Sequence, residues 1–108
     1  MSLEYINIIR SLTKQIVENL VLGNFEKIAN DKIKVEDIKQ RISEYDGKLT
    51  TPPEIDYANL EITKFGSEPY IYIIDYDLWI DSNKSDLTLT TIVDVEKQKI
   101  KVSDLHTL

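Results

Sequence analysis

The run Pro69–Ile80 constrains the fold of this chain more than any other stretch. Because side chains alternate between the two faces of a β-strand, the run and the residue after it divide into two sets. One face carries Tyr70, Tyr72, Ile74, Tyr76, Leu78 and Ile80, and the other carries Ile71, Ile73, Asp75, Asp77, Trp79 and Asp81. A strand that is apolar on both faces is typical of the centre of a sheet. The two aspartates beside the only tryptophan indicate that the second face opens to water at one end.

The N-terminal half predicts helices. Apolar residues recur at three- and four-residue steps over Leu3–Leu22, which predicts an amphipathic helix that ends with Gly23 in the left-handed conformation. A short helix over Phe25–Ala29 and a third helix over Val35–Tyr45 follow. Ile33 and Ile38 are spaced as a hydrophobic staple around the start of the third helix.

From Ile55 onward the apolar period becomes two, which is typical of strands. We expect strands at Tyr57–Lys64, Pro69–Ile80, Leu87–Val95 and Lys99–Val102, joined by short polar turns. The segment before them contains Pro52 and Pro53 and is expected to be an irregular connector.

The order of these elements predicts an α+β fold, with two or three N-terminal helices packed on one face of a four-stranded antiparallel meander sheet. We expect residues 1–108 to form a single domain, with a helical part at 3–45, a connector at 46–56 and a sheet at 57–106. The predicted core comprises Ile9, Leu12, Ile16, Leu20, Phe25, Ile38, Ile42, Ile62, Ile71, Ile73, Leu89, Val93 and Ile100.

Composition excludes several function classes. The net charge of −6 disfavours nucleic-acid binding, which depends on cationic contacts to phosphates. The absence of cysteine excludes thiol catalysis and cysteine-ligated zinc, and it fits a cytoplasmic location. No apolar run has the length that membrane insertion needs. The sequence leaves open whether Met1–Leu3 is native.

The spacing of the aspartates is compatible with two kinds of chemistry. Asp75, Asp77, Asp81, Asn83 and Asp86 have part of the spacing of a calcium loop, but the glycine of its sharp turn is replaced by Ile80. Acid–base catalysis would use Asp75 and Asp77, two residues apart on one strand face, with His106 as proton carrier. Structural roles are favoured over both: Asp75 and Asp77 cover an exposed sheet face, and His106 is a residue near the chain terminus. We therefore expect no metal, no cofactor and no catalytic residue, and the sequence favours a non-enzymatic function.

The leading functional hypothesis is a protein-interaction domain that uses an acidic and aromatic sheet face against a basic protein partner or for self-association, without nucleic acid or membrane. Tryptophan is enriched at interface hot spots, and charge complementarity speeds association. The candidate binding residues are Asp75, Asp77, Trp79, Asp81, Asp86, Asp104 and His106. The alternative is a small-molecule or enzymatic pocket between helices and sheet that uses Asp75, Asp77 and His106.

The C-terminal third contains the patterns Asp77-Leu78-Trp79, Ser85-Asp86-Leu87-Thr88-Leu89 and Asp104-Leu105-His106-Thr107-Leu108. These patterns, with the step Gly23-Asn24-Phe25, resemble a family of small uncharacterised bacterial proteins. The resemblance implies no activity, but it implies that Asp104 and His106 finish the last strand. Small size, acidity and helices before a meander are also similar to the immunity proteins of bacterial toxin systems, at the level of fold only.

Overall fold

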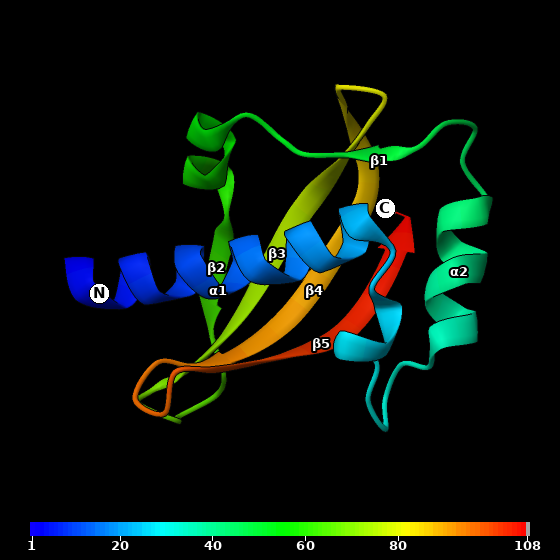
Figure 1. Ribbon diagram of the computed structural model, residues 1–108. Helices are drawn as coiled ribbons and strands as arrows, with labels where there is room; N and C mark the ends of the chain where they lie inside the picture. The colour runs from blue at the N-terminus through cyan, green and yellow to red at the C-terminus, as the bar shows by residue number, and fades with distance from the viewer. Residues whose placement is uncertain (108) are drawn as a thin grey trace.

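The computed structural model describes residues 1–107 (Figure 1). An α+β arrangement of N-terminal helices and an antiparallel sheet is confirmed. The elements are α1 (Leu3–Leu22), η1 (Phe25–Lys27), α2 (Val35–Ser43), β1 (Leu49–Thr50), η2 (Glu54–Asn59), β2 (Glu61–Lys64), β3 (Ile71–Ile80), β4 (Asn83–Asp94) and β5 (Lys99–Thr107).

The sheet has one strand more than the sequence predicted. Its order is β1-β3-β4-β5, and β2 pairs with the same edge of β3 as β1 does. Every pairing is antiparallel. The long strands β3 and β4 form the centre, as expected from the two apolar faces of β3. In Figure 1, α1 crosses one face of this sheet and α2 lies beside β5.

The two ends of α1 are closed by local hydrogen bonds. The Ser2 hydroxyl accepts a bond from the Tyr5 backbone N–H over 3.2 Å at the N-terminus. Gly23 adopts φ +77° at the C-terminus, which confirms the predicted left-handed cap. At α2, Ile33 and Ile38 are both buried, as a hydrophobic staple requires.

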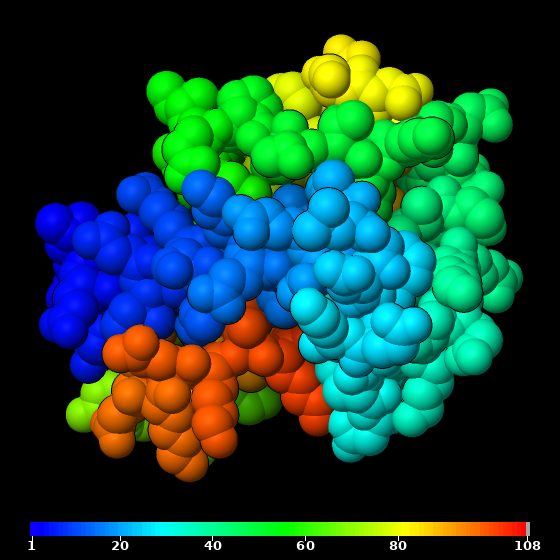
Figure 2. Space-filling view, in the orientation of Figure 1, coloured from blue at the N-terminus to red at the C-terminus, as the bar shows by residue number. Residues whose placement is uncertain are grey.

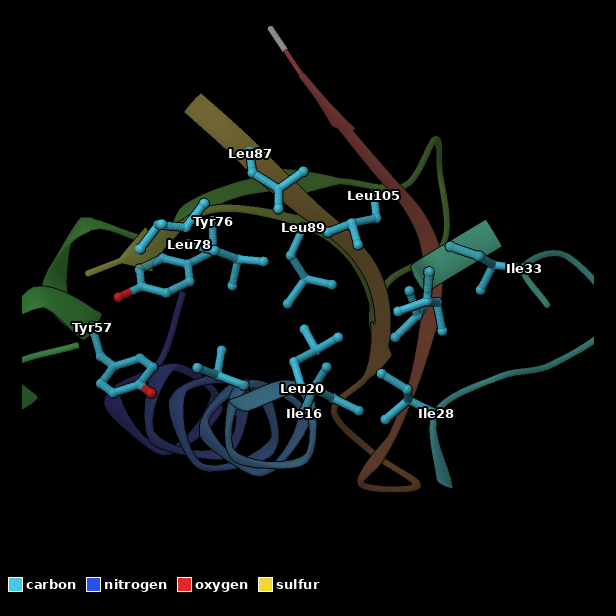
Figure 3. Packing of buried hydrophobic residues seen from close by; sticks show 14 residues of the cluster. Ile16, Leu20, Ile28, Ile33, Tyr57, Tyr76, Leu78, Leu87, Leu89 and Leu105 are labelled. Carbon is cyan, nitrogen blue, oxygen red and sulfur yellow. The ribbon is translucent and has the colours of Figure 1, made fainter. Parts of the chain in front are cut away.

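The face of β3 that packs under the helices is the tyrosine face. Tyr72, Ile74, Tyr76, Leu78 and Ile80 are buried, and Figure 3 shows Tyr76 and Leu78 directed toward α1. The prediction that Ile71 and Ile73 belong to the core is therefore wrong, because both lie half-buried on the opposite face. The other predicted core residues are buried or pack against the buried clusters.

Alternating burial along β3 defines two faces of the sheet. The helices cover the inner face, and Figure 2 shows α1 and the segments beside it hiding most of that side. We call the opposite side the outer face. It carries the half-buried residues Ile71, Ile73, Asp75, Asp77 and Trp79 of β3.

The sequence analysis missed two elements, β1 in the predicted connector and η2, and the predicted strand Tyr57–Lys64 is wrong over its first part, because η2 continues to Asn59 and β2 begins at Glu61. β1 pairs Leu49 with Ile80 and Thr50 with Trp79. The 3₁₀-helix η2 lies between β1 and β2 in the chain, and these two strands leave residues 76–78 of β3 unpaired on their edge. β5 extends to Thr107, well beyond the predicted end at Val102, which agrees with the family resemblance at Asp104 and His106.

Candidate functional site

Five of the seven candidate residues come together on the outer face. Asp75, Asp77 and Trp79 come from β3, while Asp104 and His106 come from β5. Asp75 and Asp104 both pair with Thr90 of β4, and Asp77 and His106 both pair with Thr88. Residues paired across neighbouring strands point to the same side of a sheet, so these side chains share one surface.

Part of this surface is a shallow pocket of about 160 Å³. It is lined by Asn59, Glu61, Asp75, Asp77, Lys84, Thr88 and His106. Sequence reasoning missed Asn59, Glu61, Lys84 and Thr88. Glu61 could have been found from strand alternation, because its neighbour Ile62 faces inward. Glu61 therefore lies on the outer face, where it pairs with Asp75.

Threonine hydroxyls of β4 hold the two central carboxylates. Thr90 donates to Asp75 Oδ1 over 2.6 Å, and Thr88 donates to Asp77 Oδ1 over 2.8 Å. Thr88 is buried, whereas both aspartates are half-buried. The orientation of each carboxylate is therefore set by a hydroxyl of the neighbouring strand.

His106 lies against Asp104. The His106 Nδ1 and Asp104 Oδ2 atoms are 3.1 Å apart, which is an ion-pair distance. The Nδ1 atom is itself buried, and the contact lacks the alignment of a hydrogen bond. The side chains are 32% and 54% exposed, so solvent weakens this pair.

Asp81 and Asp86 lie in supporting positions elsewhere. Asp81 and Ser82 form the two-residue turn between β3 and β4 with φ of 49° and 62°, and Asp81 Oδ1 accepts from the Lys48 backbone N–H over 3.0 Å. Asp86 Oδ1 accepts from the Tyr45 hydroxyl over 2.6 Å, just beyond α2. Their contacts hold the chain before β1 to the turn and α2 to the sheet.

Asp56 is the polar residue of this region that the sequence analysis missed. It belongs to η2, is 7% exposed, and contacts β3 beside the stretch that pairs with neither β1 nor β2. Its Oδ2 accepts from the Tyr76 hydroxyl over 2.5 Å and from Trp79 Nε1 over 2.8 Å, while its Oδ1 accepts from Asn59 Nδ2 over 2.8 Å.

The pKa of Asp56 results from two opposing effects. Burial raises it, but the hydrogen bonds from Tyr76, Asn59 and Trp79 outweigh burial and leave the pKa lowered. Burial and the bond to the charged Asp56 together raise the pKa of Tyr76. Asp56 is therefore a charged acceptor that fixes Trp79 at the margin of the outer face.

The geometry separates the alternatives. Asp75, Asp77 and His106 meet in a pocket, but that pocket lies on the outer face and not between helices and sheet. The calcium arrangement would need Asp81 and Asp86 beside Asp75 and Asp77, and both are engaged elsewhere. Within residues 1–107, no group of three or more histidines and carboxylates is arranged to hold a metal ion.

Comparison with known proteins identifies the family to which the chain belongs. No curated protein and no solved structure matches this chain significantly. Across residues 1–107, none of the helices combines the length and apolar character that crossing a membrane requires. The family model described as a domain of unknown function (DUF7668) matches residues 17–108. The chain therefore belongs to the DUF7668 family of domains of unknown function.

Proposed function

We propose that this domain is a non-catalytic protein-interaction module that binds a basic segment of another protein on the outer face of its sheet. The observation that carries the proposal is the gathering of carboxylates from three strands on that face. Glu61 of β2, Asp75 and Asp77 of β3, and Asp104 of β5 lie in neighbouring rows, with Lys84 and His106 as the nearby basic groups.

The other end of the outer face carries isoleucines on β3 and β4, with Lys99 and Lys101 of β5 beside them. Ile73 pairs with Ile92 of β4, and Ile71 follows one row further on, all three half-buried. Along the outer face of β3, two isoleucines are therefore followed by two carboxylates. A matching segment carries lysine or arginine at one end and apolar residues at the other.

The length of the face sets the length of that segment. From Ile71 to Asp77, β3 extends roughly 20 Å at about 3.3 Å per residue. A helix that spans this distance has about 14 residues. Trp79, which Asp56 fixes at the acidic end, supplies a rigid aromatic contact for the basic end.

Binding is favoured over acid–base catalysis because the required groups are engaged separately. Asp75 and Asp77 accept from Thr90 and Thr88, whereas His106 lies against Asp104. Self-association through this face would place two sets of carboxylates against each other, which repulsion disfavours at low salt. A basic partner is thus the better occupant. A toxin with a basic surface is the form of partner that the likeness to immunity proteins implies.

The test is a titration of the isotope-labelled domain with one defined probe, which we call the basic-apolar peptide. It is a helix-forming peptide of about 14 residues with lysines in one half and leucines in the other. The control peptide has glutamate in place of every lysine. We expect saturable shifts of the backbone amides of Glu61, Asp75, Asp77 and Asp104, and weaker binding in 1 M salt, where the Debye length falls to about 3 Å.

Three results would contradict the proposal. One is a shift pattern confined to α1 and α2. Another is equal binding of the glutamate peptide, which would remove charge as the basis of recognition. The third is an affinity that is independent of salt.

A further inference from the structure

A second concave surface lies on the opposite side of the molecule from the outer face. It runs between the exposed side of α1 and the 3₁₀-helix η2, which are neighbours in Figure 2. We call it the α1–η2 groove. Its volume is about 570 Å³, which falls within the roughly 300–1,000 Å³ typical of small-molecule sites.

One wall of the groove is a stripe of polar residues on α1. Asn7, Arg10, Ser11 and Lys14 follow one another at helical spacing on a single side of the helix. All four side chains carry hydrogen-bond donors. Lys14 Nζ already binds Glu54 Oε2 over 2.8 Å, whereas no carboxylate of residues 1–107 lies within ion-pair distance of Arg10.

The other wall is largely apolar and comes from η2. Ile55 is 83% exposed, and Ala58 lies beside it on the same wall. An apolar body seated against Ile55 and Ala58 would remove this surface from water. The groove thus presents donors on one wall and apolar surface on the other.

Tyr57 supplies a second, independent indication of a ligand. It lines the groove, is 4% exposed, and its hydroxyl has no hydrogen-bond partner within the described chain. Figure 3 shows this hydroxyl directed toward α1. An unpaired buried hydroxyl costs about 1–3 kcal/mol, so an acceptor atom placed there would be favoured.

The Tyr57 hydroxyl is a donor under all ordinary conditions. Burial is the main cause of its raised pKa of about 12, and the charges of Glu54, Glu18 and Asp56 add to it. Glu54 also lines the groove, but its charge is offset by Lys14. The groups that remain to recognise a ligand are Arg10, Asn7, Ser11 and Tyr57.

We propose that the α1–η2 groove binds a small carboxylic acid with an apolar body. Its carboxylate is held by the Arg10 guanidinium and accepts from the Tyr57 hydroxyl, and its body lies on Ile55 and Ala58. A guanidinium matches a carboxylate in charge and in planar geometry. The net charge of −6 opposes an anion at long range, but salt at 0.15 M screens charges beyond about 8 Å.

The test uses three probes of one shape, which are 4-phenylbutyrate, its neutral amide and the matching amine 4-phenylbutylamine. Amide shifts of the labelled domain are followed during each titration. We expect saturable shifts at residues 7–14 and 54–58 with the acid, with a dissociation constant on the order of 1–10 mM for a probe of this size. The amide and the amine should bind about tenfold more weakly.

Three variants locate the contacts. Arg10→Gln should weaken binding of the acid about tenfold, and Tyr57→Phe about two- to tenfold. Lys39→Gln removes an exposed cation of α2 and should leave binding unchanged. Tyr57→Phe also leaves no hydroxyl to satisfy, so its melting temperature should equal or exceed that of the unsubstituted protein.

The proposal is overturned if the amide binds as well as the acid, if the shifts fall outside the groove, or if Arg10→Gln binds like Lys39→Gln. These outcomes do not depend on whether the basic-apolar peptide binds, because binding of that peptide is measured by amide shifts of residues on the other side of the sheet.

Discussion

The indole nitrogen of Trp79 donates to a carboxylate oxygen of Asp56 over 2.8 Å, next to the stretch of β3 that pairs with neither β1 nor β2. Trp79 belongs to the outer face, and the same oxygen also accepts from Tyr76 of the inner face. One buried carboxylate of η2 thus joins both faces of the central strand. Through this hydrogen bond, Asp56 holds the Trp79 ring in place at the edge of the candidate site.

Substitution Asp56→Asn should destabilise the protein by about 1–3 kcal/mol at neutral pH, because charge-assisted hydrogen bonds to a buried acceptor become neutral ones. The lowered pKa of Asp56 adds a pH signature. Its contribution is complete above the unfolded value of about 3.9 and is lost as pH falls through the lower folded value. Denaturant unfolding measured at neutral and acidic pH checks both effects.

The substituted protein should lose less stability than the parent when the pH is lowered into this range. Equal losses in the two proteins would show that Asp56 does not hold its charge in the folded state as described.

Substitution of Trp79 should separate its two roles. Trp79→Phe removes the N–H donor while it keeps an aromatic ring, and should cost about 0.5–3 kcal/mol of stability. Trp79→Ala also removes buried apolar surface and should cost more. Chemical denaturation of both variants provides the comparison. A Trp79→Phe protein as stable as the parent would mean that the bond to Asp56 adds nothing to the folded state.

Gly47 is required both by backbone conformation and by space. It has φ +114°, and a Cβ atom there would clash with the carboxylate of Asp81. Gly66 has φ +58° with nothing near the added atom, so it is the matched control. We expect Gly66→Ala to cost about 1 kcal/mol and Gly47→Ala at least about 1 kcal/mol more. Thermal unfolding of the two variants tests this, and equal losses would contradict the contact with Asp81.

Tyr57 predicts a loss of stability at alkaline pH. Because its pKa is raised to about 12 in the folded protein, its contribution is complete below the unfolded value near 10 and disappears as the pH rises through 12. Ultraviolet titration of phenolate should show a late-ionising group that is lost in Tyr57→Phe. A titration curve in which the variant retains the same late group would contradict the burial of this phenol.

Local patterns predicted most of the fold. Helical periodicity identified α1, Gly23 identified its end, and two-residue periodicity identified the strands. The choice between the two faces of β3 was harder, since both are apolar at one end. The inner face is the one with tyrosines because Asp75 and Asp77 interrupt the other face, and the buried Tyr76 hydroxyl finds an acceptor in Asp56. That partner comes from a segment where prolines predicted only a connector.

Only the part of the candidate site that lies on a single strand could be predicted from the sequence. Asp75, Asp77 and Trp79 share a face by simple alternation, but Glu61 and Thr88 join them through pairing between strands that sequence does not reveal. Spacing in the sequence does not distinguish Asp81 and Asp86 from the others. A bulge in register between Asp77 and Trp79, followed by the tight turn, separates them from the outer face.

The direct test of the central claim is the affinity of the basic-apolar peptide for Asp75→Asn/Asp77→Asn, compared with Glu26→Gln/Glu68→Gln. Both double variants remove two negative charges, and Glu26 and Glu68 are exposed residues of η1 and of the turn between β2 and β3, outside the strands that carry the acidic residues of the outer face. Asparagine retains an acceptor for Thr90 and Thr88, so melting temperatures should confirm that both proteins fold. We predict a loss of affinity of about tenfold for the aspartate variant and less than about twofold for the glutamate variant. Equal losses in the two variants would show that only net charge matters, and would contradict a specific acidic binding face.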